Sequence, residues 1–154
     1  WNYQQIDLGF NYRMNDIQAA LGLNQLKRLD QYVKRRHEIA KNYDLELKDL
    51  SLTTPWQAPN TYSSYHLYPV LVKLNSGFKN QRQVYDELRD KNIAVNLHYT
   101  PVHRHPYYEN LGFKKNDFSI AEKFHQEVIS IPLYAILQDS HQEYVIEALK
   151  KILT

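Results

Sequence analysis

The chain contains no cysteine and only four glycines among its 154 residues. Without cysteine it can form neither a disulfide framework nor a thiolate metal site. With so few glycines it offers no glycine-rich loop of the kind that cradles phosphates. No apolar run approaches the ~20 residues of a membrane-spanning helix, and the first residues do not resemble a signal peptide. These absences fit a cytoplasmic protein with no membrane partner.

A strong net charge is also lacking. The 19 Lys and Arg residues nearly balance 17 Asp and Glu residues, which gives a formal net charge of +2. This balance lacks the basic footprint of a nucleic-acid-binding domain, so we expect no nucleic-acid partner.

Tyrosine, by contrast, is abundant, with 13 residues. Its ring favours flat, amphipathic contacts such as those of sugar sites and subunit interfaces. The chain also starts at Trp1, without Met, directly in a structured-looking motif. We therefore expect a piece of a longer protein.

Residues 15–48 carry a helical pattern. Asn15 predicts an N-cap, with Gln18 completing a capping box, and apolar residues then recur at three- and four-residue spacing. The first turns are apolar on almost every side, which predicts burial. Unbroken, this helix would be ~50 Å long and would link two bodies. The polar stretch 51–64 reads as a loop, which places a boundary near residue 50.

The remainder alternates short strands and helices. Strands are expected at 65–74, 92–97 and 129–133, with Pro69 placing the first at a sheet edge or a bulge. Helices are expected at 80–91 with Asn80 as N-cap, at 119–128 with a Ser119–Glu122 capping box, and from 139 with an Asp139–Gln142 box. The sum is a small α+β unit with helices on one face.

Two stretches could bind a ligand. Asn11 and Arg13 lie in a loop just before a helix N-terminus, where free N–H groups favour an anion such as phosphate. Asn11 can donate through its amide and Arg13 can make a paired contact. The alternative is that Asn11 serves a turn and Arg13 an ion pair.

The second stretch holds three histidines, His98, His103 and His105, within eight residues. Metal binding is the weaker interpretation, because no Cys or acidic residue joins them and two prolines constrain the loop. Contact of His98, Tyr99 and His103 with a polar ligand is more plausible. The alternative is that they are ordinary loop and core residues.

Three segments resemble one known family. The run from Asp7 to Leu23 closely resembles the G-x-N-x-R-M-x-x-x-Q-A-A-x-G segment of the DegT/DnrJ/EryC1/StrS sugar-nucleotide aminotransferases. The run from His98 to His103 is similar to the family's H-Y-x-P-x-H segment. The run from Ser130 to Leu133 is similar to its S-I/L-P-L/M-x-P strand, although Ala135 or Ile136 stands where the family often has proline. The likeness covers essentially the whole chain. It is strongest to the UDP-4-amino-4,6-dideoxy-sugar transaminases of pseudaminic acid and spore-coat polysaccharide biosynthesis.

The resemblance implies the α/β architecture of pyridoxal phosphate (PLP)-dependent transferases of aspartate aminotransferase fold type I. Residues 1–50 would be the tail of the large domain, with the cofactor loop and a long interface helix, and residues 51–154 the small C-terminal α+β domain. Asn11 would reach the PLP phosphate of the other subunit of a homodimer, and Arg13 would lie near the cofactor or the substrate phosphates. His98, Tyr99 and His103 would line the sugar-nucleotide pocket.

The resemblance also implies what is missing. The family's Schiff-base lysine and the carboxylate that pairs with the PLP ring lie upstream of the segments present here, and none of the twelve lysines has the family's Ser-rich setting. We therefore expect no catalytic residue in this chain and no activity from it alone. The parent enzyme would transfer an amino group, with glutamate as donor, to a keto nucleotide sugar in surface polysaccharide or glycan biosynthesis. The alternative is a non-catalytic dimerisation or nucleotide-sugar-binding module of the same fold.

Overall fold

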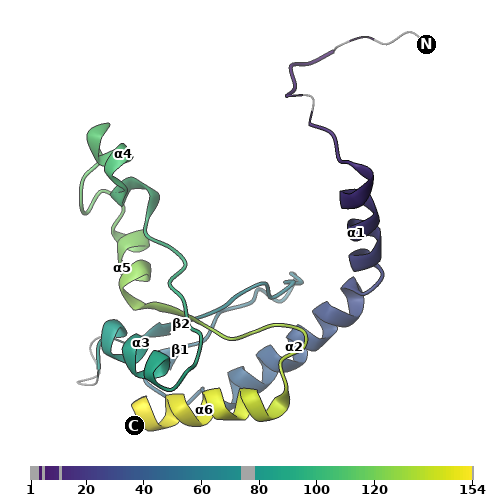
Figure 1. The fold of residues 1–154 in the computed structure, drawn as a ribbon. Coiled ribbons are helices and arrows are strands. Elements are labelled where there is room, and N and C mark those ends of the chain that lie inside the picture. Colours follow the sequence, from purple (N-terminus) through teal and green to yellow (C-terminus); the bar gives the residue numbers. More distant parts are fainter. Residues whose placement is uncertain (1–3, 5, 11, 74–78, 154) are drawn as a thin grey trace.

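Seven helical segments and three strands form the part of the chain that the computed structural model describes, residues 4, 6–10, 12–73 and 79–153 (Figure 1). In chain order they are α1 (Asp16–Leu26), α2 (Leu29–Glu46), β1 (Leu52–Thr53), β2 (Tyr68–Val72), α3 (Gln81–Asp90), η1 (Val102–Arg104), α4 (Pro106–Asn110), α5 (Ser119–Glu127), β3 (Val128–Ile131) and α6 (Asp139–Leu153). Within these residues no helix combines the length and apolarity needed to cross a bilayer.

The N-terminal helical pattern forms two helices instead of one. Asn15 caps α1 as predicted. Its side-chain oxygen accepts a hydrogen bond from the backbone N–H of Gln18, and the Gln18 side-chain oxygen accepts one from the backbone N–H of Asn15. The helix then stops at Leu26, where the Arg28 amide bonds to the Gln25 carbonyl three residues back. Helix α2 restarts at Leu29 and turns α1 away from it (Figure 1). The predicted helical pattern is therefore confirmed, but the condition of an unbroken helix is not met.

The three strands form one antiparallel sheet in the order β1-β2-β3. Pro69 lies in the central strand, opposite Ser130, so the predicted edge position is wrong. Ser130 exchanges both of its backbone hydrogen bonds with Asn96, on the side away from β2. The Pro69–Ser130 pair is consequently one that exchanges no ladder bonds, and β1 ends opposite Leu71, so the proline interrupts no ladder. The strand expected at 92–97 is reduced to the Asn96–Ser130 bridge.

One hydrophobic core joins the sheet to the helices. Its members come from the C-terminal half of α2, the strands, α3, α6 and the segments that follow α2, α3 and β3. The largest fully buried ones are Tyr43, Tyr68, Ile39, Leu47, Leu88, Ile129 and Leu149. The Tyr43 hydroxyl donates to the Pro132 carbonyl at 2.9 Å, and the Gln142 amide donates to the Ile39 carbonyl at 2.8 Å. Residues on both sides of position 50 thus share this core, and the domain boundary placed there stays a prediction.

Of the three caps predicted for the later helices, one is confirmed and two are wrong. Asn80 and Gln83 form the capping box of α3, as expected. Ser119 does not cap α5, because it is already helical, and the Glu122 side chain accepts from His103 and Asn116 instead. Asp139 likewise lies inside α6, where its carboxylate pairs with Arg35. Both of these predicted boxes are wrong.

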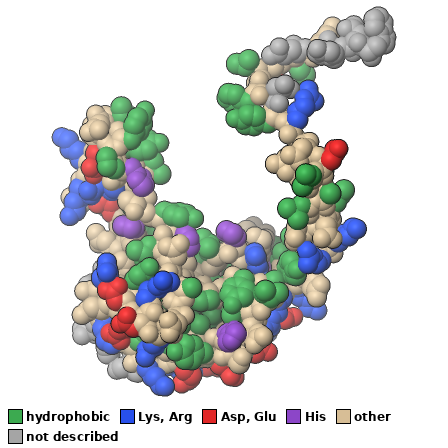
Figure 2. All heavy atoms as spheres, viewed as in Figure 1, with side chains coloured by type: hydrophobic (Ala, Val, Ile, Leu, Met, Phe, Trp, Pro, Cys, Tyr) green, Lys and Arg blue, Asp and Glu red, His purple; other side chains and the backbone are tan. Residues whose placement is uncertain are grey.

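The N-terminal arm, by which we mean the described residues from 4 to 29, projects from this body (Figure 1). Helix α1 has no buried residue, and a Cβ added at Gly22 would meet no atom within 4 Å. The large apolar side chains of the arm are exposed instead, and Figure 2 shows them along it. They include Ile6, Leu8, Phe10, Ile17, Leu21, Leu23 and Leu26. The burial expected for this helix start is therefore not provided by the described part of this chain.

Candidate functional site

Residues 98–103 form a segment that runs from the Asn96 bridge into η1, and His98 fastens its first end. The His98 Nδ1 lies 2.8 Å from the Ser130 hydroxyl of β3, and the His98 Nε2 lies 3.4 Å from the Asn96 side-chain amide. Ser130 is buried, and the backbone of β3 already bonds to Asn96 at this point. The His98–Tyr99 peptide bond is cis. His98 is thus held by the sheet at both ring nitrogens.

His103 fastens the other end of the segment. Its Nε2 lies 2.8 Å from Glu122 Oε1, and both side chains are buried, with 6% and 8% exposure. The same carboxylate oxygen accepts a hydrogen bond from the backbone N–H of Asn116 at 2.6 Å, and the His103 ring packs against Phe118. The hydrogen bond from His103 lowers the pKa of the Glu122 carboxyl; burial opposes this effect and the Asn116 amide adds to it.

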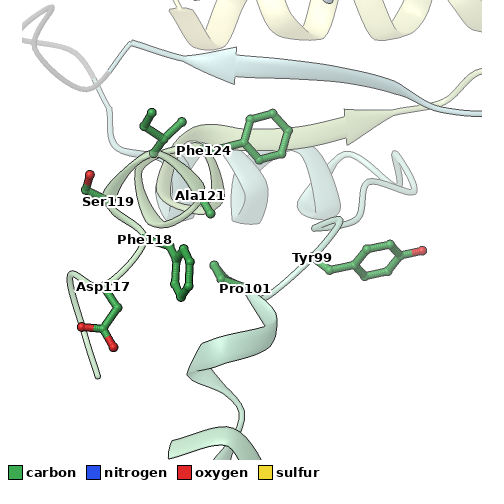
Figure 3. A pocket seen from close by; sticks show the side chains of 8 residues that line it. Tyr99, Pro101, Asp117, Phe118, Ser119, Ala121 and Phe124 are labelled. Atoms are coloured by element: carbon green, nitrogen blue, oxygen red, sulfur yellow. The ribbon is translucent and has the colours of Figure 1, made fainter. Parts of the chain in front are cut away.

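Tyr99, between these two fastened ends, is 70% exposed. It lines a pocket of about 660 Å³ together with residues of the loop and of α5: Pro101, Asp117, Phe118, Ser119, Ile120, Ala121 and Phe124. Figure 3 shows Phe118 next to Pro101 and the Tyr99 side chain extending away from both. The pocket is mainly apolar and aromatic, with Ser119 and Asp117 as its polar groups, so it suits a flat ligand with a few polar atoms.

The residues predicted from the sequence therefore divide by environment. His98, Tyr99 and His103 do lie on one segment, but only Tyr99 lines the larger pocket. His103 lines a smaller one of about 320 Å³ with apolar neighbours that include Val102 and Phe113. Glu122 and Ser130, which hold the two histidines, were not identified as site residues. A serine between two isoleucines in a buried strand was the available signal for Ser130.

The other predicted stretch lies elsewhere. Asn11 falls outside the described residues. Arg13 is exposed on the N-terminal arm, which stands apart from α4 and α5 (Figure 1). The described chain therefore does not bring Arg13 to the segment 98–103. A site that uses both would need another body between them.

The chain offers little to a metal ion or to a covalently held cofactor. Across residues 4, 6–10, 12–73 and 79–153, no three His, Cys, Asp or Glu side chains gather in a way that could hold a metal. None of the twelve lysines is buried. Three are half-buried, Lys79, Lys91 and Lys150, and of these Lys79 pairs with Glu87 and Lys150 with Glu46. A Schiff-base lysine needs desolvation or a neighbouring cation to supply a free amine. The residues present do not fit that role.

Comparison with known proteins gives consistent likenesses. Residues 1–150 match the model of the DegT/DnrJ/EryC1/StrS aminotransferase family. The chain is 37% identical to the spore coat polysaccharide biosynthesis protein SpsC of Bacillus subtilis, over 99% of the chain and 40% of that protein. It is 32% identical to the UDP-4-amino-4,6-dideoxy-N-acetyl-beta-L-altrosamine transaminase of Campylobacter jejuni, again over 99% and 40%. It thus spans about 40% of the length of these relatives.

A solved structure also resembles this chain. Spr1654 of Streptococcus pneumoniae, a candidate sugar aminotransferase, matches in its PMP-form with a TM-score of 0.85 and 32% identity, over 99% of this chain and 38% of that one. Its PLP-form matches with a TM-score of 0.83. These likenesses confirm the fold class that the sequence resemblance implied.

Proposed function

Because the chain belongs to the DegT/DnrJ/EryC1/StrS aminotransferase family, we propose that it is the C-terminal part of a PLP-dependent sugar aminotransferase. The whole enzyme would transfer an amino group from glutamate to a keto nucleotide sugar, in the biosynthesis of a surface polysaccharide or glycan. The observation that carries this proposal is the match of nearly the whole chain to only 40% of each relative, in sequence and in fold. A cytoplasmic location follows from where nucleotide sugars are used as substrates.

In this proposal the segment 98–103 serves the substrate. Tyr99 would contact the nucleotide sugar directly, because it is the exposed member of the segment and lines the larger pocket. His98 and His103 would lie behind it, because each is already hydrogen-bonded to a side chain of this chain, Ser130 and Glu122 respectively. The aromatic lining would receive the flat parts of the ligand, while Tyr99 can also donate a hydrogen bond through its hydroxyl.

The N-terminal arm would serve a homodimer. Its exposed apolar side chains are numerous enough to mark an interaction surface, and a second subunit or the large domain would cover them. Asn11 would then meet the phosphate of the partner subunit's PLP, and the Arg13 guanidinium would lie near the cofactor or the substrate phosphates. When bound, PLP supplies the electron sink for amino transfer. The covalent anchor for PLP would come from outside this chain.

A second candidate function is a non-catalytic module of the same fold, which dimerises or binds a nucleotide sugar. This candidate is supported by the lysines, because none of the twelve is buried as a Schiff-base lysine would need to be. The two candidates differ in whether the chain can complete an active site.

A chimera tests the proposal. In it, this chain replaces the matching 40% of the Campylobacter transaminase. The rest of that protein would supply the Schiff-base lysine that the family resemblance implies. We expect the chimera to bind PLP and to aminate a keto nucleotide sugar. The chain alone should retain no PLP absorbance after gel filtration and should be inactive. Stable, lysine-bound PLP on the chain alone, or a folded, PLP-loaded chimera without activity, would contradict the proposal.

A further inference from the structure

Buried polar side chains are few in the described part of the chain, and they are unevenly placed. Tyrosines apart, four polar or charged residues are buried there: His103, Glu122, Ser130 and Gln142. Gln142 joins α6 to α2 through the Ile39 carbonyl. The other three belong to the anchoring of segment 98–103: His103 is part of the segment, and Glu122 and Ser130 hold its histidines. A buried polar group destabilises the fold unless it is hydrogen-bonded, so this concentration on one exposed segment requires an explanation.

The two contacts grip the segment at its two ends from different elements. Ser130, in the middle of β3, holds His98 at 2.8 Å. Glu122, on the inner side of α5, holds His103 at 2.8 Å and at the same time fixes the Asn116 amide of the loop before α5. The His103–Glu122 hydrogen bond is buried, and the His98–Ser130 hydrogen bond is partly buried. The chain between them is too short to relax freely while both ends are held.

The residue between the two grips is the one that faces outward. Tyr99 is 70% exposed, although it sits next to the half-buried His98 and close to the buried His103. A purely structural connection would not need two buried polar anchors to display a tyrosine. Preorganising a side chain that meets a ligand does need such support, because a binding group must be held in place by its neighbours.

We propose that Ser130 and Glu122 are positioning residues, which hold the segment 98–103 at both ends and so fix where Tyr99 meets the substrate. The identity of that substrate as a nucleotide sugar rests on the proposed function, whereas the two-point anchoring does not. Neither residue touches the ligand in this account. Each acts through a histidine.

The first test measures the order of the segment in the full 154-residue chain by NMR relaxation. We expect the Tyr99 backbone amide to have an order parameter of about 0.85, and to fall below about 0.6 in Ser130→Ala and in Glu122→Ala. Glu122→Gln keeps an oxygen that accepts from both His103 and Asn116, so it should restore the order. If Glu122→Ala does not fold, Ser130→Ala and Glu122→Gln still decide the question.

Gln142→Ala is the matched control. It removes the remaining buried polar side chain of the described residues, tyrosines apart, and should destabilise the fold, yet it touches neither anchor. Tyr99 should stay ordered in it. If Tyr99 remains ordered in both anchor variants, or becomes equally mobile in Gln142→Ala, the anchoring is wrong.

The second test uses the chimera. Ser130→Ala and Glu122→Ala should raise KM for the nucleotide sugar about tenfold and leave KM for glutamate unchanged, since only the contact through Tyr99 is misplaced. Equal changes in both KM values would overturn the positioning role. A chimera that is inactive before any substitution would instead count against the proposed function, and the order parameters would still decide the anchoring.

Discussion

We expect this chain to self-associate through its exposed N-terminal arm, and two lysines introduced there should weaken that association strongly. Ile17 and Leu21 lie one helical turn apart on α1 and are 82% and 59% exposed. Covering a fully exposed side chain of this size stabilises by ~1.5–3 kcal/mol, so the pair contributes about 2–4 kcal/mol to an interface that covers both. Ile17→Lys with Leu21→Lys removes that contribution and would bury two charges as well. The association constant should fall by roughly 30-fold to 1,000-fold.

Sedimentation equilibrium of the wild-type chain and the double variant measures this fall. The matched control is Asn110→Lys with Gln126→Lys, which adds the same charge at two exposed positions outside the arm. Because α1 contributes no buried residue, the double variant should also melt at the wild-type temperature at concentrations where both chains are monomeric. A wild-type chain that stays monomeric at high concentration would refute the reasoning, as would a double variant that associates as strongly as the wild type.

Three further predictions concern the fold. Tyr43→Phe should lower the free energy of unfolding by about 1–2 kcal/mol in urea titrations, because it leaves the Pro132 carbonyl without its buried donor; Tyr144→Phe, at a half-exposed site, should have a much smaller effect. Asn80→Ala should lower that free energy by ~1 kcal/mol through loss of the α3 cap, and Asn80→Asp should largely preserve it; equal losses would argue against capping. The lowered pKa of Glu122 means that its stabilising contribution is present above the ordinary carboxyl pKa and is lost as pH falls through the lowered folded-state value. Wild type should therefore lose more stability than Glu122→Gln between about pH 5 and pH 3, and parallel acid limbs would contradict this.

Local patterns in the sequence were read correctly where their partners are close in the chain. Asn15 with Gln18 and Asn80 with Gln83 form their capping boxes because both partners lie within one exposed turn. The similar spacing of Ser119 and Glu122 misled, because Glu122 is drawn to His103, 19 residues away. A short-range pattern cannot reveal a competing partner that only the tertiary fold brings near.

The candidate site shows the same division. His98, Tyr99 and His103 could be found together because they are consecutive or nearly so. Their different environments could not be predicted, because Ser130 lies 32 residues from His98 in the chain and only the sheet brings the two together. The position of Pro69 in the central strand and the break after Leu26 also escaped prediction. Pro69 is tolerated in the central strand because β1 ends before it, and the sequence does not show where β1 ends. The break after Leu26 has no Gly or Pro to mark it.

Amino transfer by the chimera tests the central claim most directly. Formation of 2-oxoglutarate from glutamate should require the keto nucleotide sugar and should match the aminated sugar mole for mole. Tyr99→Ala in this chain should weaken the reaction through KM for the sugar. A folded, dimeric, PLP-loaded chimera that forms no 2-oxoglutarate with any keto nucleotide sugar would contradict the claim that this chain completes a sugar aminotransferase.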